Sequence, residues 1–135
     1  MSWIKWSLVA LFFVAILVLP FSCQQQPYQQ GEILYNNFCT SCHMEDGTGL
    51  VGNIPPLVGA DYVKEDPLRM ACIIRKGIED TIVVNGVSYN QPMAAIPQLT
   101  EFEITNVINY INHAWGNDYG VVKLGDVRAR LEACD

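Results

Sequence analysis

Two cysteines and a histidine stand close together in the segment Cys39-Thr40-Ser41-Cys42-His43. On a helix, positions i, i+3 and i+4 lie on one face, so both thiols and the imidazole can reach the same flat group. The spacing C-x-x-C-H is the pattern of c-type haem attachment, in which the thiols form thioethers with the vinyl groups and the histidine binds iron. The sequence therefore predicts one covalently attached haem c on Cys39 and Cys42, with His43 as an axial ligand.

The same two cysteines allow other interpretations, because C-x-x-C alone also occurs in redox dithiols and zinc knuckles. The histidine directly after Cys42 is much more typical of haem attachment. A thiol–disulfide oxidoreductase would place Cys39 and Cys42 beside a strand–helix–strand unit, and the surrounding sequence has no such pattern. A haem spectrum distinguishes the two hypotheses.

A second axial ligand is expected, because an open iron would bind oxygen species and reorganise at each electron transfer. Of the methionines, Met44 is joined directly to His43 and cannot cross the ring, and Met1 belongs to the predicted signal peptide. Met70 lies in an apolar helical segment and is expected in the core. Elimination leaves Met93, which lies in an irregular stretch ahead of a capped helix.

The first 22 residues are predicted to be a signal peptide. Lys5 gives a basic start, and the apolar run 8–19 is short for a bilayer span but typical of a signal-peptide core. The run ends at Ser22-Cys23, which is similar to a bacterial lipoprotein cleavage site, although Pro20 stands where such sites usually have Leu. Cys23 is therefore the expected lipidated residue, and an uncleaved N-terminal anchor is the alternative. Either way, the globular part is expected on the periplasmic side of a bacterial membrane.

The polar segment 24–30 is interpreted as a tether, so residues 23–30 form the lipid anchor and tether and residues 31–135 form one domain. The chain has 14 acidic and 8 basic side chains, for a net charge of −6. Removal of residues 1–22 would also remove one basic side chain, that of Lys5, and would make the chain more negative. An acidic surface argues against nucleic-acid binding and favours protein partners with a basic docking patch.

The cysteine count favours one disulfide. Of the five cysteines, Cys39 and Cys42 are assigned to haem and Cys23 to lipid, which leaves Cys72 and Cys134 in an oxidising compartment. An even pair can form a disulfide between the helix near residue 70 and the C-terminal tail. The alternative is that Cys72 is only a small buried apolar residue.

The elements that must position these groups are mostly helical. Asn85-Gly86 lies between two β-prone triplets and predicts a hairpin with a type I′ turn. Thr100 and Glu103 predict a capping box at the start of the last strong helix. His113, near the end of that helix, is interpreted as a surface or helix-terminal histidine. Four helices are expected: 32–43, 67–76, one from Thr100 to just before Gly116-Asn117, and a weaker one at about 125–133. The segment 44–59 is rich in Gly and Pro and is expected to be irregular.

The segment 47–52 fits G-x-G-x-x-G, the fingerprint of dinucleotide binding. That pattern is meaningful only between a strand and a helix, whereas here it follows a helix and leads into Pro55-Pro56. We therefore expect no nucleotide, and we interpret these glycines as loop positions close to the haem edge.

The chain resembles a class I monohaem cytochrome c over nearly all of residues 31–120. The resemblance rests on Gly31 and Tyr35 in the first helix, the Cys39–His43 motif, the segment 55–59, a methionine in the loop before the last main helix, and the segment 107–111. It implies a mainly α fold, with helices wrapped around one haem and one small hairpin. It also implies that the first and last helices cross at Gly31, Tyr35 and Tyr110.

The resemblance further implies roles at the site. Met93 matches the family's ligand position. The Pro55 carbonyl would accept the proton from the far nitrogen of the proximal histidine, and Leu57 would pack on the haem. Three aromatic residues are candidates for hydrogen bonds to the propionates, with core packing as the alternative: Tyr62, Tyr89 and Trp115.

The function implied is one-electron transfer rather than enzymatic catalysis, in a bacterial respiratory or dehydrogenase chain at the outer face of a membrane. Hydrophobic wrapping and a methionine ligand would both favour the ferrous state. The alternative is a fixed haem subunit of a membrane oxidoreductase complex, serving as its electron-exit module.

Overall fold

A computed structural model describes residues 27–134. The predicted signal peptide, the predicted lipidation site Cys23 and the first part of the tether, residues 24–26, lie outside the described residues. Within residues 27–134, no helix is both long enough and apolar enough to cross a membrane.

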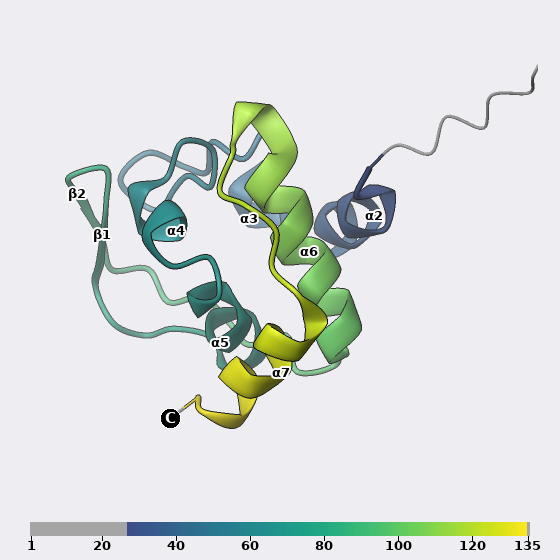
Figure 1. Cartoon of the computed structure of the whole chain (residues 1–135). Coiled ribbons are helices and arrows are strands. Elements are labelled where there is room, and N and C mark those ends of the chain that lie inside the picture. The colour runs from purple at the N-terminus through teal and green to yellow at the C-terminus, as the bar shows by residue number, and fades with distance from the viewer. Residues whose placement is uncertain (1–26, 135) are drawn as a thin grey trace, which may run out of the picture.

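The described chain is mainly helical with one small antiparallel sheet, as the sequence predicts (Figure 1). One helix and the short helix of the Cys39–His43 motif come first, then two short helices, the hairpin, the long helix and a final helix. In chain order the elements are α2 (Gln29–Phe38), α3 (Thr40–His43), α4 (Asp61–Glu65), α5 (Arg69–Lys76), β1 (Ile82–Val84), β2 (Val87–Tyr89), α6 (Glu101–His113), the 3₁₀ turn η1 (Ala114–Gly116) and α7 (Leu124–Glu132).

Helices α2 and α6 cross closely at Gly31, as the family resemblance implies. A Cβ atom at Gly31 would collide with the Asn106 carbonyl oxygen and the Tyr110 Cβ. Beside the crossing, the rings of Tyr35 and Tyr110 have centroids 5.3 Å apart. Glycine is thus required here because two helix backbones meet with no room for a side chain.

We expect Gly31→Ala to lower the free energy of unfolding by about 1–3 kcal/mol, because the added methyl group must push α2 away from α6. Gly125 in α7 is the matched control, since a Cβ there meets nothing within 4 Å. Gly125→Ala should be neutral or stabilising by up to about 1 kcal/mol, as expected for alanine in a helix. Urea unfolding measures both. Equal midpoints for the two variants would contradict this account of the crossing.

The sequence predicts one helix over 32–43, whereas the structure has two. α2 begins earlier, at Gln29, and a break at Cys39 (φ −117°, ψ −32°) separates it from α3. The carbonyl of Cys39 accepts from the amides of Cys42 (3.1 Å) and His43 (2.9 Å), so the motif forms a tight turn of its own. The break turns Cys39 and His43 inward, where both are buried.

The hairpin confirms its sequence signal. Ile82 pairs with Tyr89 and Val84 with Val87. Asn85 (φ 51°) and Gly86 (φ 78°) both have positive φ, as a type I′ turn requires.

Two short helices precede the hairpin, and only one was expected. Helix α5 begins two residues after Pro67 and ends at Gly77, close to the predicted range. Helix α4 was missed, because its five residues are too few to show helical periodicity.

The capping box of α6 is present. The Thr100 hydroxyl accepts from the Glu103 amide (3.2 Å), and the Glu103 carboxylate accepts from the Thr100 amide (2.8 Å). Helix α6 ends at His113, and η1 replaces the last turn that was expected before Gly116.

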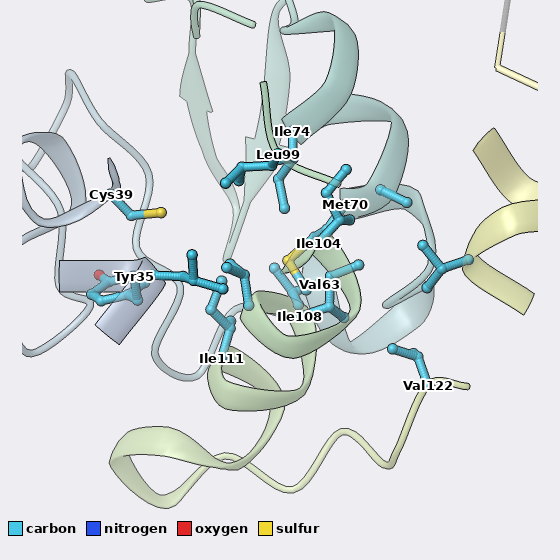
Figure 2. Close-up of a cluster of buried hydrophobic side chains, with 14 of the residues drawn as sticks. Tyr35, Cys39, Val63, Met70, Ile74, Leu99, Ile104, Ile108, Ile111 and Val122 are labelled. Carbon is cyan, nitrogen blue, oxygen red and sulfur yellow. The ribbon is translucent and has the colours of Figure 1, made fainter. Parts of the chain in front are cut away.

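The core lies where α6 meets α5 and the start of α4. Met70 of α5 is buried beside Val63, Ile104 and Ile108, and Figure 2 shows these side chains together. This agrees with the expectation that Met70 is a core residue.

The C-terminal helix α7 packs on α5 and α6. A disulfide joins Cys72 of α5 to Cys134, which follows α7. In addition, the Lys76 ammonium donates to the Cys134 carbonyl (2.6 Å), and Arg130 forms an ion pair with Asp66 (3.2 Å). The tail is thus attached to the middle of the chain by one covalent bond and two polar contacts.

Replacement of both Cys72 and Cys134 by serine should lower the free energy of unfolding by up to about 4 kcal/mol. The disulfide connects residues 62 positions apart, and the chain-entropy account gives this magnitude for a ring of that size. Denaturant unfolding measures the loss, and the visible spectrum should stay unchanged because neither cysteine lines the cavity described below. An unchanged unfolding midpoint would show that the link adds no stability.

Candidate haem site

One apolar cavity of about 350 Å³ lies between α3, α5, the hairpin and the loop before α6. The structure brings all of the predicted haem-binding residues to its walls, although they come from three separate parts of the chain. These residues are Cys39, Cys42, His43, Pro55, Leu57 and Met93.

The walls suit an apolar ring that carries a few polar groups. Most of the lining is aliphatic, with contributions from α4, α5, β1 and α6. The polar lining residues are few and include Asp80, Gln91 and the two tyrosines Tyr62 and Tyr89. Two thiols can attach a c-type haem, and an imidazole and a thioether can bind its iron. All four groups surround this cavity, so the residues present fit this cofactor.

The two thiols of the motif differ in environment. Cys39 is buried, Cys42 is exposed, and both are free thiols in the described structure. Burial, with a smaller contribution from the nearby Cys42, raises the pKa of Cys39 to about 12. Redox dithiols depend on a lowered thiol pKa. A buried thiol with a raised pKa is a weak nucleophile, so Cys39 itself is poorly suited to attack a disulfide.

His43 is held as a neutral imidazole. Its Nδ1 donates to the Pro55 carbonyl oxygen at 3.1 Å, the contact that the family resemblance implies. Burial lowers the pKa of His43, and the hydrogen bond to Pro55 only partly offsets this effect. Because Nδ1 carries the proton, Nε2 keeps the free electron pair that binding to iron requires.

Met93 is held by its backbone. Its amide and carbonyl exchange hydrogen bonds of 2.9 and 3.0 Å with Ile78, in an isolated antiparallel bridge. A Cβ at Gly77 would collide with the Met93 carbonyl, so the two segments are in close contact. Met70 also lines the cavity but is buried in the core, and Met44 does not line it. These positions keep Met93 as the predicted second ligand.

Of the three aromatic residues that are candidates for hydrogen bonds to the haem propionates, two lie at the cavity and one does not. Tyr62 and Tyr89 line the cavity. Trp115 does not, because its ring packs against Gly47 and Tyr35 and its indole N–H donates to the Glu45 carbonyl (3.0 Å).

Sequence reasoning missed most of the aliphatic lining and also three other lining residues, Phe38, Asp80 and Gln91. The first is the last residue of α2 and the other two flank the hairpin, and no local sequence signal marks them as lining residues.

The glycines of the loop 47–52 adjoin the cavity without lining it. Gly47, Gly49 and Gly52 all have positive φ, and none of them lines the cavity. Gly47 instead makes room for the Trp115 ring, and Gly49 makes room for the backbone at Pro55. The wall of the cavity is formed by the residues just after this loop, from Ile54 to Leu57.

His113 also lies away from the cavity, as expected. Its ring stacks on Tyr28 with centroids 4.5 Å apart, and its Nδ1 donates to the Asn109 carbonyl (2.8 Å).

A helical domain with a C-x-x-C-H turn, a histidine and a methionine around one apolar cavity defines a c-type cytochrome. Comparison with known families agrees, since residues 28–115 match the family described as cytochrome c. The chain belongs to the cytochrome c family, a family of electron-transfer proteins, and its cofactor is covalently attached haem c.

Two kinds of relative are similar to this chain. Cytochrome c-552 of Thermus thermophilus is 35% identical over 83 residues, which cover 58% of this chain and 63% of the relative. The cytochrome c subunit of the quinone alcohol dehydrogenase of Gluconobacter oxydans is 30% identical over 104 residues, which cover 73% of this chain and 21% of the relative. The matched part thus spans less than two thirds of either relative.

Proposed function

We propose that this protein is a one-electron carrier whose haem c is held between His43 and Met93. The observation that carries the proposal is that both thiols, the imidazole and the thioether line one apolar cavity. When bound, the haem would supply a reversible one-electron change of its iron between Fe(II) and Fe(III), with the electron taken from one partner and passed to another.

The residues around the haem set its reduction potential. The apolar walls exclude water and disfavour the more highly charged ferric state, and a thioether ligand acts in the same direction, so both raise the reduction potential. The Pro55 carbonyl acts in the opposite direction, because a hydrogen bond to Nδ1 makes the His43 imidazole a stronger donor.

Potentiometric titration followed by visible absorbance tests this function. We expect one reversible transition that fits transfer of a single electron. A two-electron transition, or reduction that is coupled to opening of a disulfide, would contradict the proposal and favour dithiol chemistry.

The electron partners are proposed to carry basic docking patches. Lys and Arg are absent from residues 27–63 and 77–122, which provide most of the cavity lining and carry acidic side chains such as Glu45, Asp46, Glu79 and Asp80. Such a surface attracts positive charge and speeds association at low ionic strength. Electron exchange with a basic partner should therefore slow as salt is added.

The protein is proposed to be lipid-anchored through Cys23 at the periplasmic side of a bacterial membrane. Cys23→Ser should then move the protein from the membrane to the soluble periplasmic fraction, because the lipid would be its only attachment once residues 1–22 are removed. Fractionation followed by haem staining measures the shift, and Gln26→Asn, in the polar tether outside the cleavage site, is the control. Intact mass should show acyl chains on Cys23. A mass that includes residues 1–22 without lipid would instead support the uncleaved anchor.

A second candidate function is that of a fixed electron-exit subunit in a membrane oxidoreductase. The similarity to a cytochrome c subunit of a quinone alcohol dehydrogenase favours it. Detergent extraction followed by size-exclusion chromatography separates the two possibilities, because a free carrier elutes alone whereas a subunit elutes with its complex.

A further inference from the structure

The segment between α6 and α7, residues 117–123, follows the part of the chain that matches the family. In Figure 1 it runs back along α6 from η1 to α7. We call it the return segment. Three buried asparagines hold it in place, namely Asn109 and Asn112 of α6 and Asn117 of the segment itself.

Two of the asparagines hold only the return segment. Asn109 exchanges two hydrogen bonds with the backbone of Val122, accepting at 2.9 Å and donating at 3.0 Å. Asn112 donates to the Gly120 carbonyl at 2.8 Å.

Asn117 also forms hydrogen bonds to the segment 55–59, which belongs neither to α6 nor to the return segment. Its Nδ2 donates to the carbonyls of Ile111 (2.8 Å) and Leu57 (3.1 Å), and its Oδ1 accepts from the Gly59 amide (2.9 Å). The two carbonyls can only accept and the amide can only donate, so these partners allow a single orientation of the side chain. Asn117 therefore connects the end of α6 to the segment 55–59.

The segment 55–59 is the one that carries the hydrogen-bond acceptor of His43. On its other side, the Gly47 carbonyl accepts from the amides of Leu57 (2.7 Å) and Val58 (3.1 Å). Pro55 and Pro56 each have a restricted φ, so the position of Leu57 strongly limits the direction of the Pro55 carbonyl. Asn117 is thus one of the supports that hold this carbonyl in place, together with Gly47 and the bridge between Leu50 and Ile54 just before Pro55.

We propose that Asn117 is a positioning residue for the haem ligand: it holds the 55–59 segment so that the Pro55 carbonyl stays hydrogen-bonded to His43 Nδ1. The inference rests on the proposed role of His43 as an iron ligand. A partner of this kind orients a ligating histidine and increases its basicity. Loss of the contact weakens the imidazole as a donor and shifts the equilibrium toward the ferrous form.

Asn117→Leu tests the inference, with Asn109→Leu as the matched control. Each variant replaces one buried amide by an apolar side chain of similar volume and leaves backbone groups without partners. Asn109→Leu leaves those of Val122, and Asn117→Leu leaves those of Ile111, Leu57 and Gly59, so both variants should be less stable than wild type. Only Asn117 reaches the segment that carries Pro55. We expect Asn117→Leu alone to raise the equilibrium constant for reduction. It should also speed solvent exchange of the His43 Nδ1 proton by roughly fivefold, which corresponds to weakening one hydrogen bond by about 1 kcal/mol.

Failure of the positioning role and failure of the proposed function give different results. If Asn117→Leu and Asn109→Leu lose stability but leave the reduction equilibrium and the Nδ1 exchange rate unchanged, the positioning role is wrong. If NMR of the wild-type holoprotein shows no His43 ring protons shifted by the iron, the proposed function itself fails.

A measurement on the wild type covers the case in which Asn117→Leu does not fold. The Gly59 amide lies in an exposed loop and should still exchange slowly, because Asn117 accepts its hydrogen bond. Gly52, an exposed loop glycine beyond the reach of Asn117, is the reference. Equal exchange rates for the two amides would overturn the inference.

Discussion

Replacement of both Cys39 and Cys42 by alanine is expected to remove all covalently attached haem. Each thiol forms one of the two thioether bonds, so the double variant has no remaining covalent link to the cofactor. Haem staining of a denaturing gel measures the result, and the wild-type band should be coloured while that of the variant should be colourless. Acid–acetone extraction of the wild type should leave the haem with the protein.

Ser41→Ala is the matched control for this loss. Ser41 lies between the two cysteines, is exposed, and forms only a long 3.9 Å contact with the Cys42 sulfur. It should keep the full stain. A colourless wild type, or a stained double variant, would show that attachment does not use this motif.

Met93→Leu should produce the second largest effect. Leucine keeps the volume and the backbone bridge to Ile78 but removes the sulfur, so the iron loses the proposed thioether ligand. We expect three changes. The near-infrared sulfur-to-iron band disappears, the reduction potential falls by on the order of 0.2 V out of the roughly 0.8 V that axial ligands span, and cyanide binds.

Met70→Leu is the control for Met93→Leu, because both methionines line the cavity but Met70 is buried in the core. Met70→Leu should cost less than about 1.5 kcal/mol of stability and leave the band intact. Loss of the band in Met70→Leu together with its retention in Met93→Leu would reverse the ligand assignment.

Local sequence was enough for the features that a few neighbouring residues decide. Asn85-Gly86 predicted the hairpin, because both positions must have positive φ. Thr100 and Glu103 predicted the start of α6, because a capping box involves residues only three apart. The break at Cys39 was missed, because a helical pattern does not show where burial of a side chain will turn the backbone.

The candidate site was predicted in its parts. The motif from Cys39 to His43 carries its own chemical signature, and elimination among the methionines pointed to Met93. Pro55 and Leu57 came only from the family resemblance, because neither has a local signal for a haem site. The sequence did not indicate the contact that Gly47 makes with the Trp115 ring, because these residues are 68 positions apart.

The sequence by itself determined the cofactor chemistry, the helical class and the hairpin, because each depends on residue types at short spacing. Only the tertiary structure placed Met93 against Ile78, and only it brought Asn117 to Leu57, which lies 60 positions earlier in the chain. Such contacts form between segments whose meeting depends on how all the helices pack, and no short stretch of sequence contains that information. The physical reason is that buried backbone groups must find partners wherever packing leaves them.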